Sequence, residues 1–152
     1  MALTLLPKTN FSSPFASMTG NHVAVRVADL EEARRWWVEK LDFRFVHEWT
    51  FGDLHLAYVA PPTDDTFFVE LIGGGTPIPE RPYTDLENSL ELAGYHHLCF
   101  MVESVDETLD EVKRRGVKIV KEAFDLPEIS RRLAFFCDPW GNLIELAEVV
   151  ID

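Results

Sequence analysis

The stretch His97-Leu-Cys-Phe-Met-Val102 repeats the pattern of His22-Val-Ala-Val-Arg-Val27, in which a histidine opens a short apolar run. Glu70 and Glu145 each lie inside a further apolar run, and the two pairs have the same separation in the sequence, since 97 − 22 and 145 − 70 both equal 75. Chemically matched residues at one constant separation indicate an internal repeat. Each repeat contributes one imidazole and one carboxylate, and two of each form a common donor set for a borderline divalent metal ion.

The same separation relates two helix starts. Asp29-Leu-Glu-Glu32 and Ser104-Val-Asp-Glu107 both have the form of a capping box, and 104 − 29 is again 75. In this motif a short acceptor side chain and a glutamate three residues later satisfy free N–H groups at the start of a helix. The repeat therefore extends to residues with no metal chemistry, which favours a true duplication.

Hydrophobic periodicity and turn residues predict the order strand–helix–strand–strand–strand, twice. The first repeat is expected to place its elements at 22–27, 30–40, 43–49, 54–59 and 67–72. The second repeat is expected at 97–102, a helix ending near 115, 117–123, 132–137 and 142–149. We expect an N-terminal arm or leader at 1–20 and a single domain at 21–150, made of module one (21–75), a linker (76–94) with a short helix within 85–92, and module two (95–150).

Composition narrows the classes of function. The chain has 152 residues, 47% of them hydrophobic, which suits one packed domain. A net charge of −12 argues against binding to nucleic acid or an anionic membrane surface. No apolar run approaches the roughly 20 residues of a membrane span, and two cysteines do not indicate a disulfide framework. We therefore expect a cytoplasmic protein.

Strand alternation predicts where the candidate ligands point. His22, Ala24 and Arg26 should share one face of the first strand, opposite the valines that pack under the helix. Glu70 should lie on a face whose neighbours are largely apolar, where a carboxylate is costly unless it is paired or bound to a cation. Two alternatives stay open from the residues alone: a satisfied structural histidine, and a glutamate paired with Arg26.

The second strand follows the same alternation. His97, Cys99 and Met101 should face away from the helix, and the constant separation selects His97 instead of its neighbour His96. We expect His96 to point toward the helix-packing side or outward. His47 and His55 stand outside the repeat and are expected to be structural or surface residues, with His55 a weak candidate for lining the cavity.

These residues resemble the vicinal oxygen chelate superfamily, which includes glyoxalase, bleomycin resistance proteins and dioxygenases. The resemblance rests on His22-Val-Ala-Val-Arg-Val-Ala-Asp-Leu-Glu-Glu-Ala33, on His97-Leu-Cys-Phe-Met-Val102, and above all on Phe136-Cys-Asp-Pro-Trp-Gly-Asn-Leu-Ile-Glu-Leu146. It implies an α+β fold in which two βαβββ modules form a curved, mostly antiparallel sheet around a metal cavity, often in a homodimer. The ligand pattern is closest to that of glyoxalase I-like members.

The resemblance also implies roles for the candidate residues. The metal ligands would be His22, Glu70, His97 and Glu145, holding Ni, Co, Zn or Mn. The reaction would be that of a lyase or isomerase that removes a proton next to a metal-polarised carbonyl of a small oxygen-bearing substrate. Glu145 matches the position of the catalytic base, and Glu70 is the second candidate. The candidate substrate-binding residues are Arg26, Phe68, Cys99 and Met101.

Two other functions fit the same resemblance. An extradiol-type dioxygenase would use Fe(II) held by His22, His97 and Glu145, with open positions for substrate and oxygen. A non-enzymatic protein that sequesters a ligand, like the bleomycin-resistance relatives, would need no metal centre. The complete set of four ligands favours the first reading, a metal-dependent lyase or isomerase.

Overall fold

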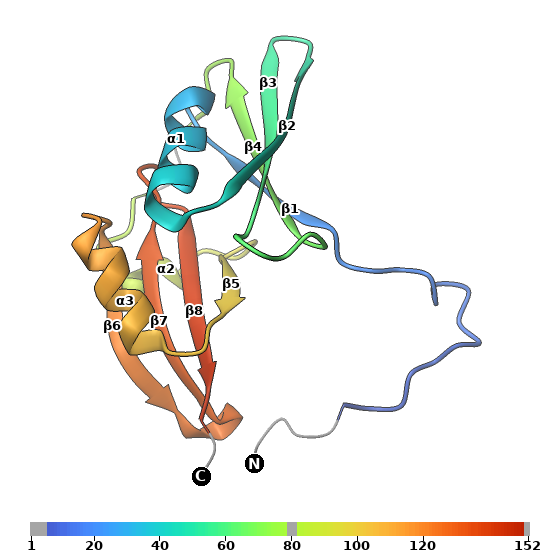
Figure 1. Ribbon diagram of the computed structural model, residues 1–152, viewed down its shortest axis with the longest axis vertical. Helices are drawn as coiled ribbons and strands as arrows, with labels where there is room; N and C mark the ends of the chain where they lie inside the picture. The colour runs from blue at the N-terminus through green and yellow to red at the C-terminus, as the bar shows by residue number, and fades with distance from the viewer. Residues whose placement is uncertain (1–5, 79–81, 151–152) are drawn as a thin grey trace.

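A computed structural model describes residues 6–78 and 82–150 (Figure 1). Part of the expected arm (residues 1–5), part of the expected linker (79–81) and residues 151–152 lie outside the described residues. In chain order the elements are β1 (His22–Arg26), α1 (Leu30–Leu41), β2 (Arg44–Phe51), β3 (Leu54–Ala60), β4 (Phe68–Gly74), α2 (Leu86–Ser89), β5 (His97–Met101), α3 (Val105–Arg114), β6 (Ile119–Leu126), β7 (Arg131–Cys137) and β8 (Leu143–Val149).

The strands form two sheets with the same internal order. The first sheet runs β1-β4-β3-β2 and the second runs β5-β8-β7-β6. In each, the first strand pairs in parallel with the last, and the remaining neighbours are antiparallel. The predicted α+β class and the two repeated βαβββ modules are therefore confirmed. Among the described residues β1 and β5 are each hydrogen-bonded on one side only, so each leaves a free edge.

Both helices begin where the sequence predicts. The Asp29 side chain accepts a hydrogen bond from the Glu32 backbone N–H at 2.9 Å, and Ser104 accepts one from the Glu107 N–H at 3.2 Å. Each cap satisfies an N–H group that lacks a partner within the helix. Each strand differs from its predicted range by one to three residues at one end or both, and β2 and β6 are examples. The strand β2 continues through Phe51 where a turn was expected, and β6 continues to Leu126 because it keeps pairing with β7 as far as Arg131.

One hydrophobic core joins the two modules. Trp37 of α1 and Phe136 of β7 are almost fully buried in it. Phe100 of β5 contacts the ring of Phe43 with 5.4 Å between centroids, and that of Phe67 with 6.2 Å. The modules thus pack through their helix-covered sides, with α1 and α3 on the same side of the molecule (Figure 1).

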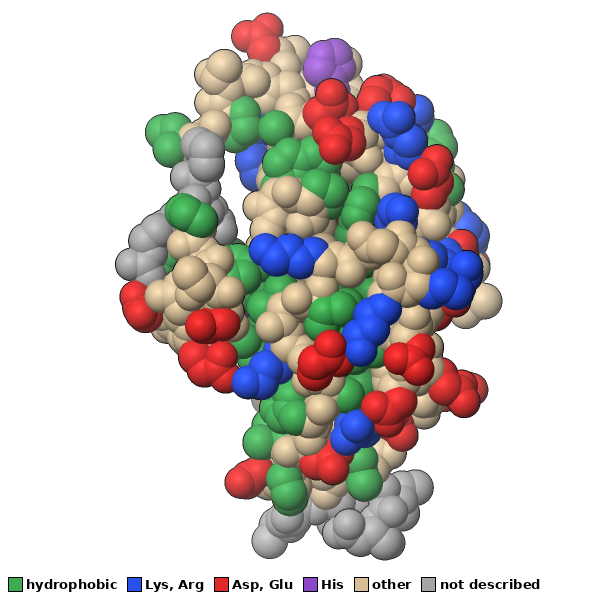
Figure 2. All heavy atoms as spheres, turned by 90° about the vertical axis from the view of Figure 1, so that its left-hand side faces the viewer, with side chains coloured by type: hydrophobic (Ala, Val, Ile, Leu, Met, Phe, Trp, Pro, Cys, Tyr) green, Lys and Arg blue, Asp and Glu red, His purple; other side chains and the backbone are tan. Residues whose placement is uncertain are grey.

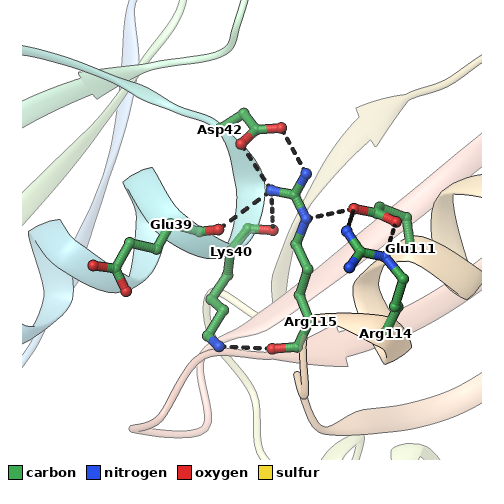
Figure 3. A network of polar contacts seen from close by, with 6 residues as sticks. All are labelled: Glu39, Lys40, Asp42, Glu111, Arg114 and Arg115. Carbon is green, nitrogen blue, oxygen red and sulfur yellow. Dashed lines mark hydrogen bonds and ion pairs between the residues drawn. The ribbon is translucent and has the colours of Figure 1, made fainter.

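Where the ends of α1 and α3 meet, two repeat-related residues bond to each other (Figure 3). The Lys40 Nζ donates to the Arg115 carbonyl at 2.6 Å, and the Arg115 guanidinium donates to the Lys40 carbonyl at 3.4 Å. These residues are 75 apart, the separation of the repeat itself. A residue can contact its own counterpart only close to a symmetry axis. The two modules are therefore related by an approximate two-fold axis that passes near this contact.

The Arg115 side chain strengthens this junction. Its guanidinium binds both carboxylate oxygens of Asp42 at 2.8 and 2.9 Å, and it also binds Glu111 at 2.7 Å (Figure 3). A guanidinium matches a carboxylate through two parallel hydrogen bonds, which fixes orientation as well as charge. The pairing with Arg114 and Arg115 lowers the pKa of Glu111 from 4.5 to about 2.

The face that carries the helices is a mixed charged surface. Figure 2 shows acidic and basic side chains interspersed over it, separated by small apolar areas. This arrangement is typical of a solvated surface. In the described part of the chain, no helix has both the length and the apolar character needed to cross a bilayer. The segment 6–20 leaves β1 and runs away from both sheets (Figure 1).

Candidate functional site

In module one, strand register brings His22 and Glu70 together. Glu70 of β4 lies opposite Ala24 of β1, two residues after His22, so both side chains project from the same sheet face. The His22 Nε2 lies 3.0 Å from the Glu70 Oε2. The imidazole is 36% exposed and the carboxylate only 13%. The structure therefore pairs the two residues that the repeat selected in this module.

Module two reproduces this arrangement. Glu145 of β8 lies opposite Cys99 of β5, again two residues after the histidine. The His97 Nε2 lies 2.7 Å from the Glu145 Oε2, and the side chains are 33% and 12% exposed. Two separate pairs thus have the same register, the same contacting atoms and nearly the same burial.

An aromatic ring backs each pair, and the sequence analysis did not single out either ring. Tyr58 lies opposite Glu70 in the sheet, and its ring centroid is 5.5 Å from that of His22. Phe135 lies opposite Glu145, 5.3 Å from the His97 ring. Burial, followed by the charge of Glu70, raises the pKa of Tyr58. The period-two alternation of β3 and β7 could have predicted that both rings lie on the sheet faces that carry the His–Glu pairs.

The predicted substrate-binding residues of β5 lie beside the second pair. Cys99 and Met101 are both exposed on the face that carries His97. Burial of the sulfur, then the charge of Glu145 and a hydrogen bond to it, raise the pKa of Cys99 to about 12. Cys99 thus lies close enough to Glu145 to feel its charge. Phe68 stacks on Tyr58 with 5.5 Å between centroids, beside the first pair.

Arg26 lies on the face of β1 that carries His22, but its guanidinium binds backbone carbonyls. It donates to the Ile72 carbonyl at 2.6 Å, to the Val27 carbonyl at 3.0 Å and also to the Gly74 carbonyl. These contacts tie the end of β1 to the end of β4. A role of Arg26 in substrate binding stays a prediction. In the structure its side chain links the two neighbouring strands.

The second ring nitrogen of each candidate ligand histidine also has a partner. The His22 Nδ1 lies 2.8 Å from the Asn21 Oδ1. The His97 Nδ1 lies 2.8 Å from the His96 Nδ1, and the His96 Nε2 lies 2.8 Å from the Ser89 Oγ. The sequence analysis expected His96 to point toward the helix-packing side or outward, and in the structure its ring contacts both Ser89 of α2 and the His97 ring. Burial, followed by the His97 ring, lowers the pKa of His96.

The two pairs do not merge into one cluster within the chain. Across residues 6–78 and 82–150, no three His, Cys, Asp or Glu side chains lie close enough together to hold a metal ion. His55 lines a shallow hollow of about 340 Å³ with Glu31, Glu48 and other residues, none of which is a candidate ligand. The described part of the chain thus holds two separate His–Glu pairs, each of which is a candidate half-site with one nitrogen and one oxygen atom.

Comparison with known proteins agrees with this architecture. YwkD of Bacillus subtilis (strain 168), an uncharacterised protein, is 30% identical over 84% of this chain and 94% of its own length. A probable lactoylglutathione lyase of Synechocystis sp. (strain ATCC 27184 / PCC 6803 / Kazusa) is 27% identical over 84% of this chain and 92% of its own. The lactoylglutathione lyase relationship is distant.

Solved structures share the fold at lower identity. The crystal structure of SMU.1112c superposes with a TM-score of 0.69 at 24% identity, covering 86% of this chain and 98% of that one. TnmS3, an antibiotic binding protein from Streptomyces sp. CB03234, superposes with a TM-score of 0.64 at 20% identity, covering 87% and 96%. The sequence profile of the Glyoxalase/Bleomycin resistance protein/Dioxygenase superfamily matches residues 20–146. This chain, with its duplicated βαβββ modules and paired histidines and glutamates, therefore belongs to that superfamily.

Proposed function

We propose that this protein is a metal-dependent lyase or isomerase of the glyoxalase I type, active as a homodimer. One observation carries the proposal: each module holds an imidazole Nε2 within 3.0 Å of a largely buried carboxylate oxygen, on an exposed sheet face. Two largely buried carboxylates are costly without a compensating cation. Imidazole nitrogen and carboxylate oxygen are donors that Zn, Ni, Co and Mn accept. The residues present fit such a metal ion.

A second copy of the chain would complete the centre. One chain supplies two donors at each half-site, and a stable protein site for these metals needs three or four. The histidine of each half-site lies on β1 or β5, and each of these strands is at one edge of its sheet. In a two-fold dimer, the β1 of one copy lies beside the β5 of the other, and the dimer then contains two equivalent sites. Each site combines His22 and Glu70 of one copy with His97 and Glu145 of the other.

The chain's own residues account for the proton transfer. His22, Glu70, His97 and Glu145 would hold the metal ion, which when bound would supply Lewis acidity toward a substrate carbonyl and so make the neighbouring C–H more acidic. The Glu145 carboxylate then takes that proton, and it returns the proton to the product on the adjacent atom or at the same carbon. Glu70 is the second candidate for this role. The Tyr58 and Phe135 rings exclude water from the floor of each half-site, which keeps the carboxylates reactive.

Metal content and hydrogen exchange test the proposal directly. Protein purified without added metal or chelator should contain near-stoichiometric Ni, Co, Zn or Mn by elemental mass spectrometry. The variant His97→Ala should lose the metal, whereas His47→Ala, which removes an exposed histidine outside both half-sites, should retain it. Iron would instead favour the dioxygenase, and absence of metal after reconstitution would refute the proposal.

Exchange in D₂O tests the reaction itself. A panel of α-carbonyl compounds, with lactoylglutathione among them, should include at least one whose C–H exchanges in the presence of the loaded enzyme. The variant Glu70→Gln should retain metal less tightly, because a neutral amide is a weaker donor than a carboxylate. Undiminished metal affinity in that variant would indicate a site with three ligands.

A further inference from the structure

Each candidate ligand histidine is preceded by the residue that binds its other ring nitrogen. Asn21 precedes His22, and His96 precedes His97. Asn21 and His96 therefore have the same separation as the two ligand histidines, and they occupy equivalent positions in the repeat. The two modules use different side chains at this position, yet each brings an atom within 2.8 Å of the Nδ1 of the following histidine.

In module one the acceptor determines which nitrogen of His22 carries the hydrogen. An amide oxygen accepts hydrogen bonds and donates none. The His22 Nδ1 must therefore donate to the Asn21 Oδ1, and in the neutral ring the Nε2 then has only a lone pair. That lone pair faces the Glu70 Oε2 at 3.0 Å. Two acceptors facing each other leave a place that a cation fills.

In module two a chain of hydrogen bonds gives the same result. The Ser89 hydroxyl donates to the Leu86 carbonyl, so its oxygen accepts from the His96 Nε2–H at 2.8 Å. The neutral His96 ring then has its lone pair on Nδ1, which accepts from the His97 Nδ1–H at 2.8 Å. The His97 Nε2 is left with a lone pair facing the Glu145 Oε2 at 2.7 Å.

Without these partners, the histidine and glutamate of each pair would hydrogen-bond to each other, and their metal-binding lone pairs would be occupied. A histidine free at Nδ1 adopts the form that carries hydrogen on Nε2, because that form donates a hydrogen bond to the glutamate. The Nε2 would then be unable to bind a metal, and the glutamate oxygen would already be occupied. The partner at Nδ1 prevents this, since the hydrogen bond at one nitrogen sets which nitrogen is free.

We propose that Asn21 and the chain Ser89–His96 are positioning residues that hold both ligand imidazoles in the Nδ1–H tautomer. This inference rests on the proposed metal site, but its first test needs no metal. In metal-free protein at about pH 9, well above the usual histidine pKa near 6.5, ¹⁵N chemical shifts of the rings should show Nδ1–H for His22 and His97. In His96→Ala the hydrogen on His97 should move to Nε2, and the His22 ring should be unchanged.

The other module suggests the rescue variant. His96→Asn places at this position the amide found at Asn21, so it should restore the Nδ1–H signature of His97. Zn²⁺ affinity, measured by titration calorimetry on metal-free protein, should fall about 10- to 100-fold in His96→Ala. In His96→Asn it should recover to within about threefold of the wild type. Ser89→Ala leaves His96 free to donate from either nitrogen and should give an intermediate loss of Zn²⁺ affinity.

The outcomes separate this inference from the proposed function. Unchanged His97 ring shifts in His96→Ala, in a variant that retains the wild-type circular dichroism spectrum, would overturn the inference even if the protein binds Zn²⁺ tightly. The same Zn²⁺ affinity in His96→Ala, His96→Asn and Ser89→Ala would also overturn the inference. A wild-type protein that shows the expected tautomers but binds no metal would instead refute the proposed function.

Discussion

Mixing two variants that each lack one candidate ligand tests whether each proposed metal centre combines residues from two copies of the chain. His22→Ala removes one donor from module one, and His97→Ala removes one from module two. In a homodimer of either variant, both sites lack a donor. In the mixed dimer, one site lacks both histidines, but the other combines the intact module one of one chain with the intact module two of its partner. Co-expression of the two variants should therefore restore metal binding.

The size of the recovery follows from the two-fold arrangement. Random pairing of equal amounts of the two chains makes about half of the dimers mixed, and each mixed dimer has one complete site of two. Metal content per chain should then be about a quarter of the wild-type value, against little for either variant alone. Elemental mass spectrometry after size-exclusion chromatography measures this fraction, and tags of different mass on the two chains allow the mixed dimer to be isolated. The isolated mixed dimer should carry about half of the wild-type content.

A matched control uses two changes in the same module. Co-expression of His22→Ala with Glu70→Gln leaves every module one incomplete or weakened, so no dimer of the two contains a full site. This mixture should bind no more metal than its components. Equal metal content in the two mixtures, or none in both when the wild type is loaded, would refute a centre shared between copies.

Three further predictions address catalysis, acid stability and the core. Glu145→Gln should keep the wild-type circular dichroism spectrum but abolish substrate hydrogen exchange in D₂O, and wild-type exchange would remove Glu145 from the role of base. Glu111 has a pKa lowered from 4.5 to about 2, mainly by hydrogen bonds from two arginines, so its stabilising effect is complete above pH 4.5 and lost as the pH falls toward 2. The difference in urea unfolding between Glu111→Gln and wild type should accordingly shrink below pH 4.5, and a constant difference down to pH 2 would contradict this assignment. Phe100→Ala should lower the free energy of unfolding by about 2–3 kcal/mol, because Phe100 is only half-buried between Phe43 and Phe67. A fully buried phenylalanine would lose ~3–5 kcal/mol. A loss under about 1 kcal/mol in denaturant titration would show that this ring does not join the modules.

Local patterns in the sequence predicted a large part of this architecture. The capping residues Asp29 and Ser104 start both helices as expected, because a cap depends on residues three positions away. Alternation placed His22 and His97 on exposed faces opposite the buried residues of β1 and β5. The constant separation relates more residues than the four candidate ligands, since it also relates Asn21 to His96 and Lys40 to Arg115.

By itself, the sequence determined the repeat, the order of elements and the face on which each donor lies, because these follow from periodicity within short segments. Only the tertiary structure decided which atoms meet. Register between strands far apart in the chain set the contacts of His22 with Glu70 and of His97 with Glu145. Packing of the modules through their helix-covered sides kept these two pairs apart within one chain, and the approach of α2 gave His96 its contact with Ser89. Such contacts depend on how distant elements pack in three dimensions, and no local pattern encodes that packing.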